Sequence, residues 1–278
     1  MIIWLASYPK SGNTWVRSLL SAYYYSENGN FSFDLLKNIG VYPQKKYFNK
    51  KIEKPGEINS YWDISQKKII NQKKIIFLKT HNSLLALDGK NFTKPEYTLG
   101  IIYVVRDPRN VITSLKNHYD LDYEQSLDFM LNEKKYIYDI REKNDYADFQ
   151  FLSSWSNHYK SWINNNLFKR IIIKYEDLEK DTYQTLKNLI NYINDLSRIN
   201  EKIDEKKIDN CIRTTSFEIL KHKEKKEGFS ENVYSAKTKK KIDFFHLGSK
   251  NKWREIVPKE FQEKINNTFE KDLKNLKY

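Results

Sequence analysis

The residues Ser7–Trp15 combine a lysine, hydroxyl groups and a glycine in a pattern that can hold an anion. They read Ser-Tyr-Pro-Lys-Ser-Gly-Asn-Thr-Trp, they follow a short apolar run (Ile2–Leu5), and a pattern of helical spacing (15–23) comes next. A strand, a small polar loop and a helix form a phosphate-binding loop, because backbone N–H groups and the positive end of the helix face the anion. We therefore predict an anion site formed by Lys10, Ser11, Gly12, Asn13, Thr14 and Trp15.

The spacing of this loop differs from that of nucleotide triphosphatases, which read G-x-x-x-x-G-K-[ST]. With Gly12 as the second glycine, Ser7 stands at the first glycine and Asn13 at the lysine. The cation, Lys10, lies inside the loop instead. The sequence thus disfavours a kinase-like enzyme that uses ATP, which stays a second hypothesis. A non-catalytic nucleotide or nucleic-acid binder of the same fold is a third.

Three further apolar runs each end on a polar cluster. The runs are Ile75–Leu78, Ile101–Val105 and Ile171–Ile173, and the clusters that follow are Lys79-Thr80-His81, Arg106-Asp107-Pro108 and Tyr175-Glu176-Asp177. Short runs rich in Ile and Val are typical of strands covered on both faces of a parallel sheet. Ligands bind outside the carboxyl ends of such strands. We therefore expect the four strand ends to form one site.

Helical patterns alternate with these runs, which predicts an α/β fold with a mainly parallel central sheet flanked by helices. Asp107 followed by Pro108 is a typical helix start, and apolar residues recur at helical spacing over 182–193 and 261–273. The chain has no clear repeats or linkers, so we expect a single domain over residues 1–278. The polar segments Lys37–Lys54 and Glu218–Lys241 are expected to be irregular surface loops.

Composition narrows the possible partners. The 278 residues include 49 Lys and Arg against 36 Asp and Glu, a formal net charge of +13, which suits an anionic ligand. The lysines are spread along the chain, so we expect solvated surfaces and no nucleic-acid partner. Neither a membrane span, which takes roughly 18 or more apolar residues, nor a signal-peptide pattern is visible. One cysteine, Cys211, gives no internal disulfide, and we expect a cytoplasmic location.

The motifs resemble those of sulfotransferases that use 3′-phosphoadenosine 5′-phosphosulfate (PAPS). That family has a Y-P-K-S-G-x-T-W loop, a K-T-H segment, and Y-V-x-R with a serine eight residues after the arginine. This chain has Tyr8–Trp15, Lys79–His81 and Tyr103–Arg106 with Ser114 at that spacing. Weaker matches continue in the same order over nearly the whole chain. The resemblance implies a P-loop-like topology and transfer of a sulfuryl group from PAPS to a hydroxyl or amine of a small molecule.

The resemblance also implies a role for each matching residue. His81 would be the general base. Lys10, Lys79 and Ser114 would complete the catalytic group, with the two lysines stabilising the transition state. Arg106 and Ser114 would bind the 3′-phosphate. Tyr175, Thr215, Phe217 and Trp15 would lie around the adenine. The product would be 3′-phosphoadenosine 5′-phosphate (PAP), and no metal is implied; the histidine and cysteine positions also lack the spacing of a zinc site.

One motif departs from the family pattern R-K-G-x-x-G-D-W-K near the C-terminus. Here the segment after Phe245 reads His246-Leu247-Gly248-Ser249-Lys250-Asn251-Lys252-Trp253-Arg254. The arginine–lysine pair that would bind the 3′-phosphate is replaced by His246 and Leu247, while Gly248 remains. By the resemblance, Phe245, His246, Leu247 and Gly248 are still expected to line the cofactor site. Lys250, Lys252 or a protonated His246 could substitute. The acceptor and the oligomeric state stay open, and aromatic-rich segments at 31–48, 82–87, 117–138 and 229–245 are expected to line the acceptor pocket.

Overall fold

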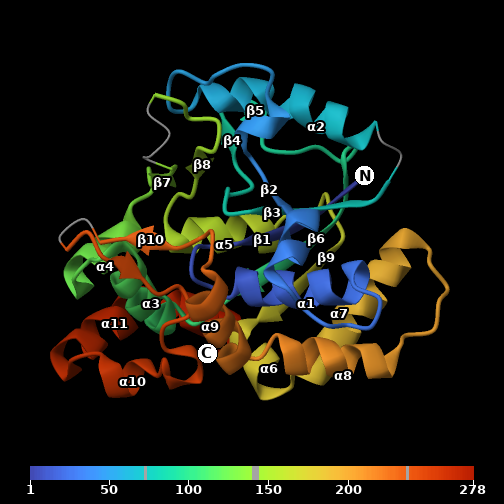
Figure 1. Cartoon of the computed structure of the whole chain (residues 1–278). Helices are drawn as coiled ribbons and strands as arrows, with labels where there is room; N and C mark the ends of the chain where they lie inside the picture. The colour runs from blue at the N-terminus through green and yellow to red at the C-terminus, as the bar shows by residue number, and fades with distance from the viewer. Residues whose placement is uncertain (72–73, 140–143, 236–237) are drawn as a thin grey trace.

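The fold is built on a parallel five-stranded sheet. The computed structural model describes residues 1–71, 74–139, 144–235 and 238–278, and Figure 1 shows the sheet at the centre of the molecule. The spatial order of its strands is β2-β3-β1-β6-β9. In chain order they are β1 (Ile2–Ser7), β2 (Gly40–Val41), β3 (Ile76–Thr80), β6 (Thr98–Val105) and β9 (Arg170–Lys174). The four predicted strands and the predicted α/β class are confirmed.

Helices surround this sheet, and short antiparallel pairs of strands lie outside it. The α-helices are α1 (Asn13–Tyr25), α2 (Trp62–Ile70), α3 (Pro108–Tyr119), α4 (Tyr123–Leu131), α5 (Trp155–Ile163), α6 (Tyr175–Lys180), α7 (Thr182–Ser197), α8 (Glu205–Thr214), α9 (Phe217–Glu227), α10 (Trp253–Ile256) and α11 (Lys259–Leu276). The paired strands are β4 (Ala86–Leu87) with β5 (Lys90–Asn91), β7 (Tyr136–Ile137) with β8 (Gln150–Phe151), and β10 (Val233–Tyr234) with β11 (Lys241–Ile242). The 3₁₀ turns are η1 (Phe33–Asn38), η2 (Lys45–Tyr47), η3 (Glu57–Tyr61) and η4 (Gly248–Lys250).

Strand β1 divides the core into two layers. All its residues are buried, and its side chains alternate between the faces, as a strand requires. Trp4 belongs to the cluster with residues of α2, α3, α5 and α11, while Leu5 belongs to the cluster with residues of α1, α7 and α8. Helices thus cover both faces of the sheet (Figure 1), which explains why the strands read as continuous apolar runs.

The register of the strands brings their carboxyl ends to one edge. β1 pairs in parallel with β3 and with β6, and β6 pairs with β9. Leu5 lies opposite Lys79, and Val105 lies opposite Lys174. The helix that follows β6 begins as predicted, because the Asp107 carboxylate accepts the backbone N–H of Arg109 at 2.9 Å.

The two polar segments differ from the prediction of irregular surface loops. Segment 37–54 contains β2, whose two residues are too few to form an apolar run, and the turn η2. Segment 218–241 begins inside α9, which buries Leu220 and Glu224. The residues after α9 turn inward and reach the site described below. Residues 236 and 237 of this segment lie outside the described part.

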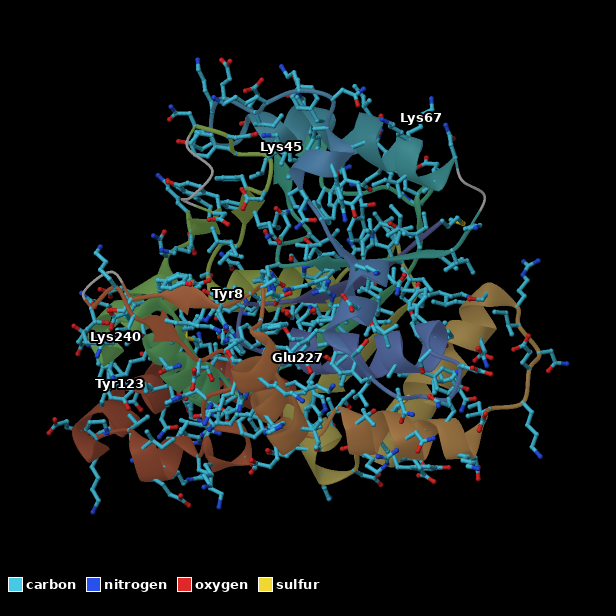
Figure 2. The ribbon with its side chains drawn as sticks, in the orientation of Figure 1. Tyr8, Lys45, Lys67, Tyr123, Glu227 and Lys240 are labelled. Atoms are coloured by element: carbon cyan, nitrogen blue, oxygen red, sulfur yellow. The ribbon has the colours of Figure 1, made fainter. Side chains whose placement is uncertain are left out.

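Charged side chains project from the molecule on all visible sides in Figure 2, with Lys67 and Lys240 at opposite ends of the view. Tyr8, in contrast, lies near the centre and is only 1% exposed. This distribution matches the expectation of solvated lysines spread over the surface.

Gly100 of β6 lies directly against side chains of α7. A Cβ at this position would lie 2.7 Å from the Tyr192 hydroxyl and even closer to the Leu196 side chain. That hydroxyl accepts the backbone N–H of Ile101 at 3.1 Å and donates to the Lys169 carbonyl at 2.9 Å. We expect Gly100→Ala to lower the free energy of unfolding by about 1–3 kcal/mol, the usual cost of overpacking, as measured by urea unfolding.

The matched background is Leu196→Ala, which makes room for the added methyl group on one side. Gly100→Ala should cost less in this background than in the wild type, because sites in contact are not additive. An equal cost in both backgrounds would contradict the packing described.

Candidate active site

A cavity of about 1430 Å³ opens at the carboxyl ends of the central strands. Its walls include the loop after β1, the middle and C-terminal end of α3, and chain from the two segments 33–46 and 228–251. Most of the predicted site residues line it: Lys10, Gly12, Asn13, Thr14, Trp15, Lys79, His81, Arg106, Ser114, Tyr175, Phe217, Phe245, His246, Leu247 and Gly248. Ser11 and Thr215 do not. The Thr215 hydroxyl donates back to the Cys211 carbonyl of α8 at 2.8 Å.

The loop after β1 is held by side chains as well as by its backbone. Asn13, which stands at the lysine position of a nucleotide triphosphatase loop, donates to the Leu5 carbonyl at 3.2 Å and to the Ser7 hydroxyl at 3.1 Å. Gly12 has a φ of +100°, and a Cβ there would lie 2.5 Å from the Tyr175 ring. Glycine is therefore required both by the backbone conformation and by the ring packed against it.

Several buried polar atoms of the loop and its surroundings have no hydrogen-bond partner among the described residues. They include the Ser11 hydroxyl, the Trp15 indole nitrogen and Nε of Arg106. Buried polar groups nearly always have a partner. Trp15 and Arg106 line the cavity, whereas Ser11 does not. A ligand with several acceptor oxygens, such as a nucleotide with two phosphates, would supply partners for the Trp15 and Arg106 donors, so the cradle fits an anionic nucleotide.

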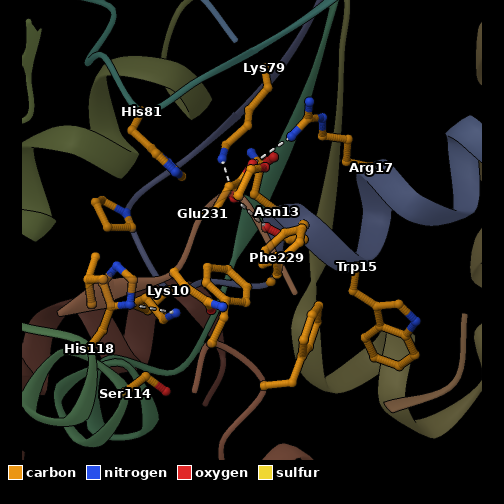
Figure 3. Close-up of a pocket in the computed structure, with 18 of the residues that line it drawn as sticks. Lys10, Asn13, Trp15, Arg17, Lys79, His81, Ser114, His118, Phe229 and Glu231 are labelled. Atoms are coloured by element: carbon orange, nitrogen blue, oxygen red, sulfur yellow. Dashed lines mark hydrogen bonds and ion pairs between the residues drawn. The ribbon is translucent and has the colours of Figure 1, made fainter. Parts of the chain in front are cut away.

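Lys10 extends into the same cavity. Its ammonium lies 3.7 Å from the centre of the Phe244 ring and 3.5 Å from Nδ1 of His118, as Figure 3 shows for the histidine contact. Burial lowers the pKa of Lys10 to about 7, although Glu231 opposes the shift. An anionic ligand would favour the charged form of this amine.

His81 is fixed in one tautomer by its neighbours. Its Nδ1 lies 2.8 Å from the Ser7 carbonyl, which can only accept, so Nδ1 carries the proton and Nε2 is free to act as a base. Its backbone N–H donates to Gln150 at 2.7 Å, and its carbonyl accepts Nε2–H of His158 at 3.0 Å. His158 in turn accepts the Tyr103 hydroxyl at 2.9 Å. The backbone and the ring of His81 are therefore both oriented.

The charge state of His81 follows from its surroundings. Burial, and then the nearby Lys79 ammonium, lower the pKa of His81 to about 3. The imidazole is therefore neutral at physiological pH, and its Nε2 lone pair is available.

Arg106 and Ser114 lie together, as their spacing predicts. The Arg106 guanidinium stacks on the Tyr175 ring at 3.9 Å, and its Nη1 lies 3.5 Å from both the Ser114 hydroxyl and the Lys10 carbonyl. Ser114 also accepts the side-chain N–H of Asn251 at 2.9 Å. Asn251 comes from the C-terminal loop that lacks the family's arginine–lysine pair, so that loop reaches the predicted phosphate site through an amide.

Among the described residues 246–254 of the C-terminal loop, no lysine or arginine lines the cavity. Gly248 lies against the Phe217 ring, where a Cβ would come within 2.6 Å. Burial and the Lys221 ammonium lower the pKa of His246, which disfavours the protonated imidazole considered above. Lys250 and Lys252 do not line the main cavity, and Lys252 lies 3.6 Å from Glu255.

The predicted acceptor segments take different positions. The cavity is lined by residues from three of these segments, 31–48, 117–138 and 229–245. Its aromatic lining includes Phe129, Tyr119 and Tyr138. No residue of 82–87 lines the cavity. Asn82 instead accepts the backbone N–H of Phe151 at 2.9 Å and so fixes the strand β8.

Two charged residues of the site were not predicted. The Glu231 carboxylate accepts from Arg17 Nη1 at 2.6 Å and from Lys79 Nζ at 2.9 Å, and Figure 3 shows it between them. The Thr14 hydroxyl donates to the same carboxylate at 3.2 Å. Arg17 could have been found, because it follows Thr14 by three residues on the helix and so shares its face. Glu231 lies in a polar segment without periodicity.

Glu231 is ionised despite its position. Burial alone would raise the pKa of this carboxyl group, but Lys79 and Arg17 outweigh it and bring the pKa to about 2. Such a shift is typical of a carboxylate held between two cations.

Comparison with known proteins assigns the family. The sulfotransferase domain profile matches residues 2–277. The chain belongs to the sulfotransferase domain family. It is 21% identical to an amine sulfotransferase of Oryctolagus cuniculus over 281 residues, which cover 98% of this chain and 81% of the relative. It is 25% identical to a flavonol 4′-sulfotransferase of Flaveria chlorifolia over 293 residues, which cover 98% and 78%.

Solved structures share the fold. A mouse sulfotransferase complexed with PAP superposes with a TM-score of 0.61 at 18% identity, and the match covers 99% of this chain and 85% of that one. Retinol dehydratase in complex with retinol and PAP gives the same TM-score at 17% identity, with 98% and 81% covered. The α/β fold and its P-loop-like topology are thereby confirmed.

Two features are absent from the described residues. No helix in this part of the chain is long and apolar enough to cross a membrane. No group of three or more His, Cys, Asp or Glu side chains among the same residues could hold a metal ion.

The His81 tautomer can be observed directly. Because its pKa is about 3, we expect the ring to stay neutral from pH 8 down to pH 5, with the proton on Nδ1. Long-range ¹H–¹⁵N correlation spectra should show a protonated Nδ1 and an unprotonated Nε2 throughout this range, and His81→Ala assigns the signals. Protonation of Nε2 above pH 5 would contradict the site described.

Proposed function

We propose that this protein transfers the sulfuryl group of PAPS to a hydroxyl or amine of a small-molecule acceptor. One observation carries the proposal: a neutral histidine with a free Nε2, His81, lies beside Lys79 at the rim of an anion-binding loop. Membership of the sulfotransferase domain family and the PAP-bound neighbours of the same fold support this choice of donor.

The donor would lie along the loop and α3. The backbone N–H groups of Gly12, Asn13 and Thr14 would face its 5′-phosphosulfate, and Arg106 with Ser114 its 3′-phosphate, because an arginine fork suits phosphate oxygens. The aromatic residues Trp15, Tyr175 and Phe217 would form the adenine end. PAPS supplies a sulfuryl group on a good leaving group, so the protein needs neither a metal nor a covalent intermediate.

The residues around the reacting atoms have distinct tasks. Nε2 of His81 accepts the proton of the attacking hydroxyl or amine. The ammonium groups of Lys10 and Lys79 face the negative charge that develops on the departing phosphate. Fixed charges of this kind accelerate a reaction because they need no reorganisation when it occurs.

The acceptor would approach His81 from the aromatic side of the cavity. Gln150, which holds the His81 backbone, pairs with Ile137 in the β7–β8 hairpin. This contact places the hairpin next to the base. The related enzymes are named for amine, luciferin and flavonol acceptors, and retinol dehydratase was also solved with androsterone. We propose an acceptor with an apolar or aromatic body and one nucleophilic group.

A screen tests this proposal. The protein is incubated with PAPS and a panel of phenols, aliphatic alcohols and primary amines, and sulfated products are detected by mass. We propose that residues 1–278 act as one domain, so the screen uses the full chain.

A cytoplasmic location of the protein remains a prediction.

Nucleotide choice separates the proposal from an ATP-dependent kinase. PAP should raise the melting temperature more than ATP does, since the 3′-phosphate meets Arg106 and Ser114 whereas no lysine stands at the nucleotide triphosphatase position. A ligand at 100 times its Kd stabilises by about 2.7 kcal/mol. A larger shift with ATP would favour the kinase, and tighter binding of an oligonucleotide than of PAP would favour a nucleic-acid binder.

Removal of the base should abolish most turnover. We expect His81→Ala to bind PAP like the wild type and to lose about 10²- to 10⁴-fold in kcat, the usual contribution of a general base. His222→Ala, a change at an exposed histidine, is the matched control. Activity of the His81 variant within a few-fold of the wild type would refute the assignment.

A further inference from the structure

Glu231 brings a negative charge into a site that binds anions. Its carboxylate contacts the first two turns of α1 through Thr14 and Arg17, and the end of β3 through Lys79. The Lys79 and Arg17 side chains are each only 7% exposed, and that of Glu231 is 20% exposed. A carboxylate here opposes the binding of a phosphosulfate by simple charge repulsion, so its presence needs a physical reason.

The two carboxylate oxygens are used differently. One oxygen, Oε1, accepts from Arg17, whose other nitrogens donate to the Ile39 and Leu36 carbonyls at 2.9 and 2.7 Å. Arg17 is thus a fixed anchor. The other oxygen, Oε2, accepts from Lys79 and Thr14. Glu231 therefore connects a rigid arginine to the flexible ammonium that lies next to the base.

We propose that Glu231 is a positioning residue that holds the Lys79 ammonium in place for sulfuryl transfer. The inference rests on the proposed function of the site. A lysine has four rotatable bonds in its side chain and a point charge at its end, so its ammonium needs a fixed acceptor to stay in one place. A displacement of about 1 Å at a reacting centre can cost roughly a hundredfold in rate.

The role of Glu231 predicts opposite effects on turnover and binding. Glu231→Gln keeps the size of the side chain and removes its charge. Lys79 then loses its strong acceptor, and kcat should fall about tenfold to a hundredfold. PAP should bind at least as tightly as to the wild type, because the negative charge is gone while both cations remain. Titration calorimetry measures PAP binding, and the best acceptor of the screen measures kcat.

A double-mutant cycle with Lys79→Ala tests whether Glu231 affects kcat through Lys79. If Glu231 acts through Lys79, Glu231→Gln should have little further effect on kcat in the Lys79→Ala background. The double variant removes one positive and one negative charge, so no new unpaired carboxylate is created. Mass detection over long incubations measures the slow rates, and thermal unfolding confirms that each variant is folded.

Glu224→Gln is the matched control. Glu224 is a buried glutamate of α9, and its carboxylate accepts the backbone N–H groups of Phe244 and Phe245 at 2.7 and 2.9 Å. Its substitution should change kcat by the same factor in both Lys79 backgrounds.

Three results would overturn the inference: an unchanged kcat in Glu231→Gln, the same loss of kcat with and without Lys79, or weaker PAP binding together with lower thermal stability. An unchanged kcat would mean that the Glu231 carboxylate only occupies the anion site while no ligand is bound. Either of the other two results would mean that Glu231 has a purely structural role. These results differ from a failure of the proposed function, in which the wild type itself neither binds PAP nor sulfates any acceptor.

Discussion

The parallel pairing of β1 with both β3 and β6 is the constraint on which the rest of the molecule depends. Because β1 is central and fully buried, its register determines which residues meet at the carboxyl edge of the sheet. The anion loop, the Lys79–His81 segment and Arg106 all begin where a strand of this sheet ends. Helices on both faces prevent any change of register, since a shift by one residue would turn Trp4 and Leu5 to the wrong layers.

The chemistry of the site depends on several charged side chains that lie close together at the carboxyl edge of the sheet. Lys10, Arg17, Lys79 and Arg106 all line one cavity, and the Glu231 carboxylate forms ion pairs with two of them, Arg17 and Lys79. Burial, and then the neighbouring cations, lower the pKa of Lys10 and of His81. An anionic nucleotide would stabilise the charged form of Lys10, so the buried cations that are unfavourable in the empty site favour the ligand.

The sequence was sufficient for the parts of this arrangement that depend on local patterns. Apolar runs predicted four strands, and Lys79, His81, Arg106 and Tyr175, which follow three of these runs, line the cavity. Asp107 predicted the start of α3. Ser11 and Thr215 show the limit of a motif, because a match in sequence does not say which way a hydroxyl points, and the Thr215 hydroxyl bonds to its own helix. Glu231 and Asn251 were not predicted, because their roles come from long-range folding of segments that have no periodicity. Strand β2 was not predicted, because its two residues are too few to form an apolar run in the sequence.

The contacts of Asn251 have a consequence for the synthesis of the chain. Its side chain donates to Ser114 and to the Asn110 carbonyl and accepts the Thr113 hydroxyl, while the backbone N–H of Trp253 donates to Asn110. The anion loop, by contrast, precedes Asn251 by more than 230 residues and therefore leaves the ribosome long before it. A nascent chain therefore exposes the loop and its cations long before the segment that closes the site emerges. The pocket becomes complete only after Asn251 has been synthesised, so a translation product truncated before this residue would contain the recognisable motif without a finished binding site.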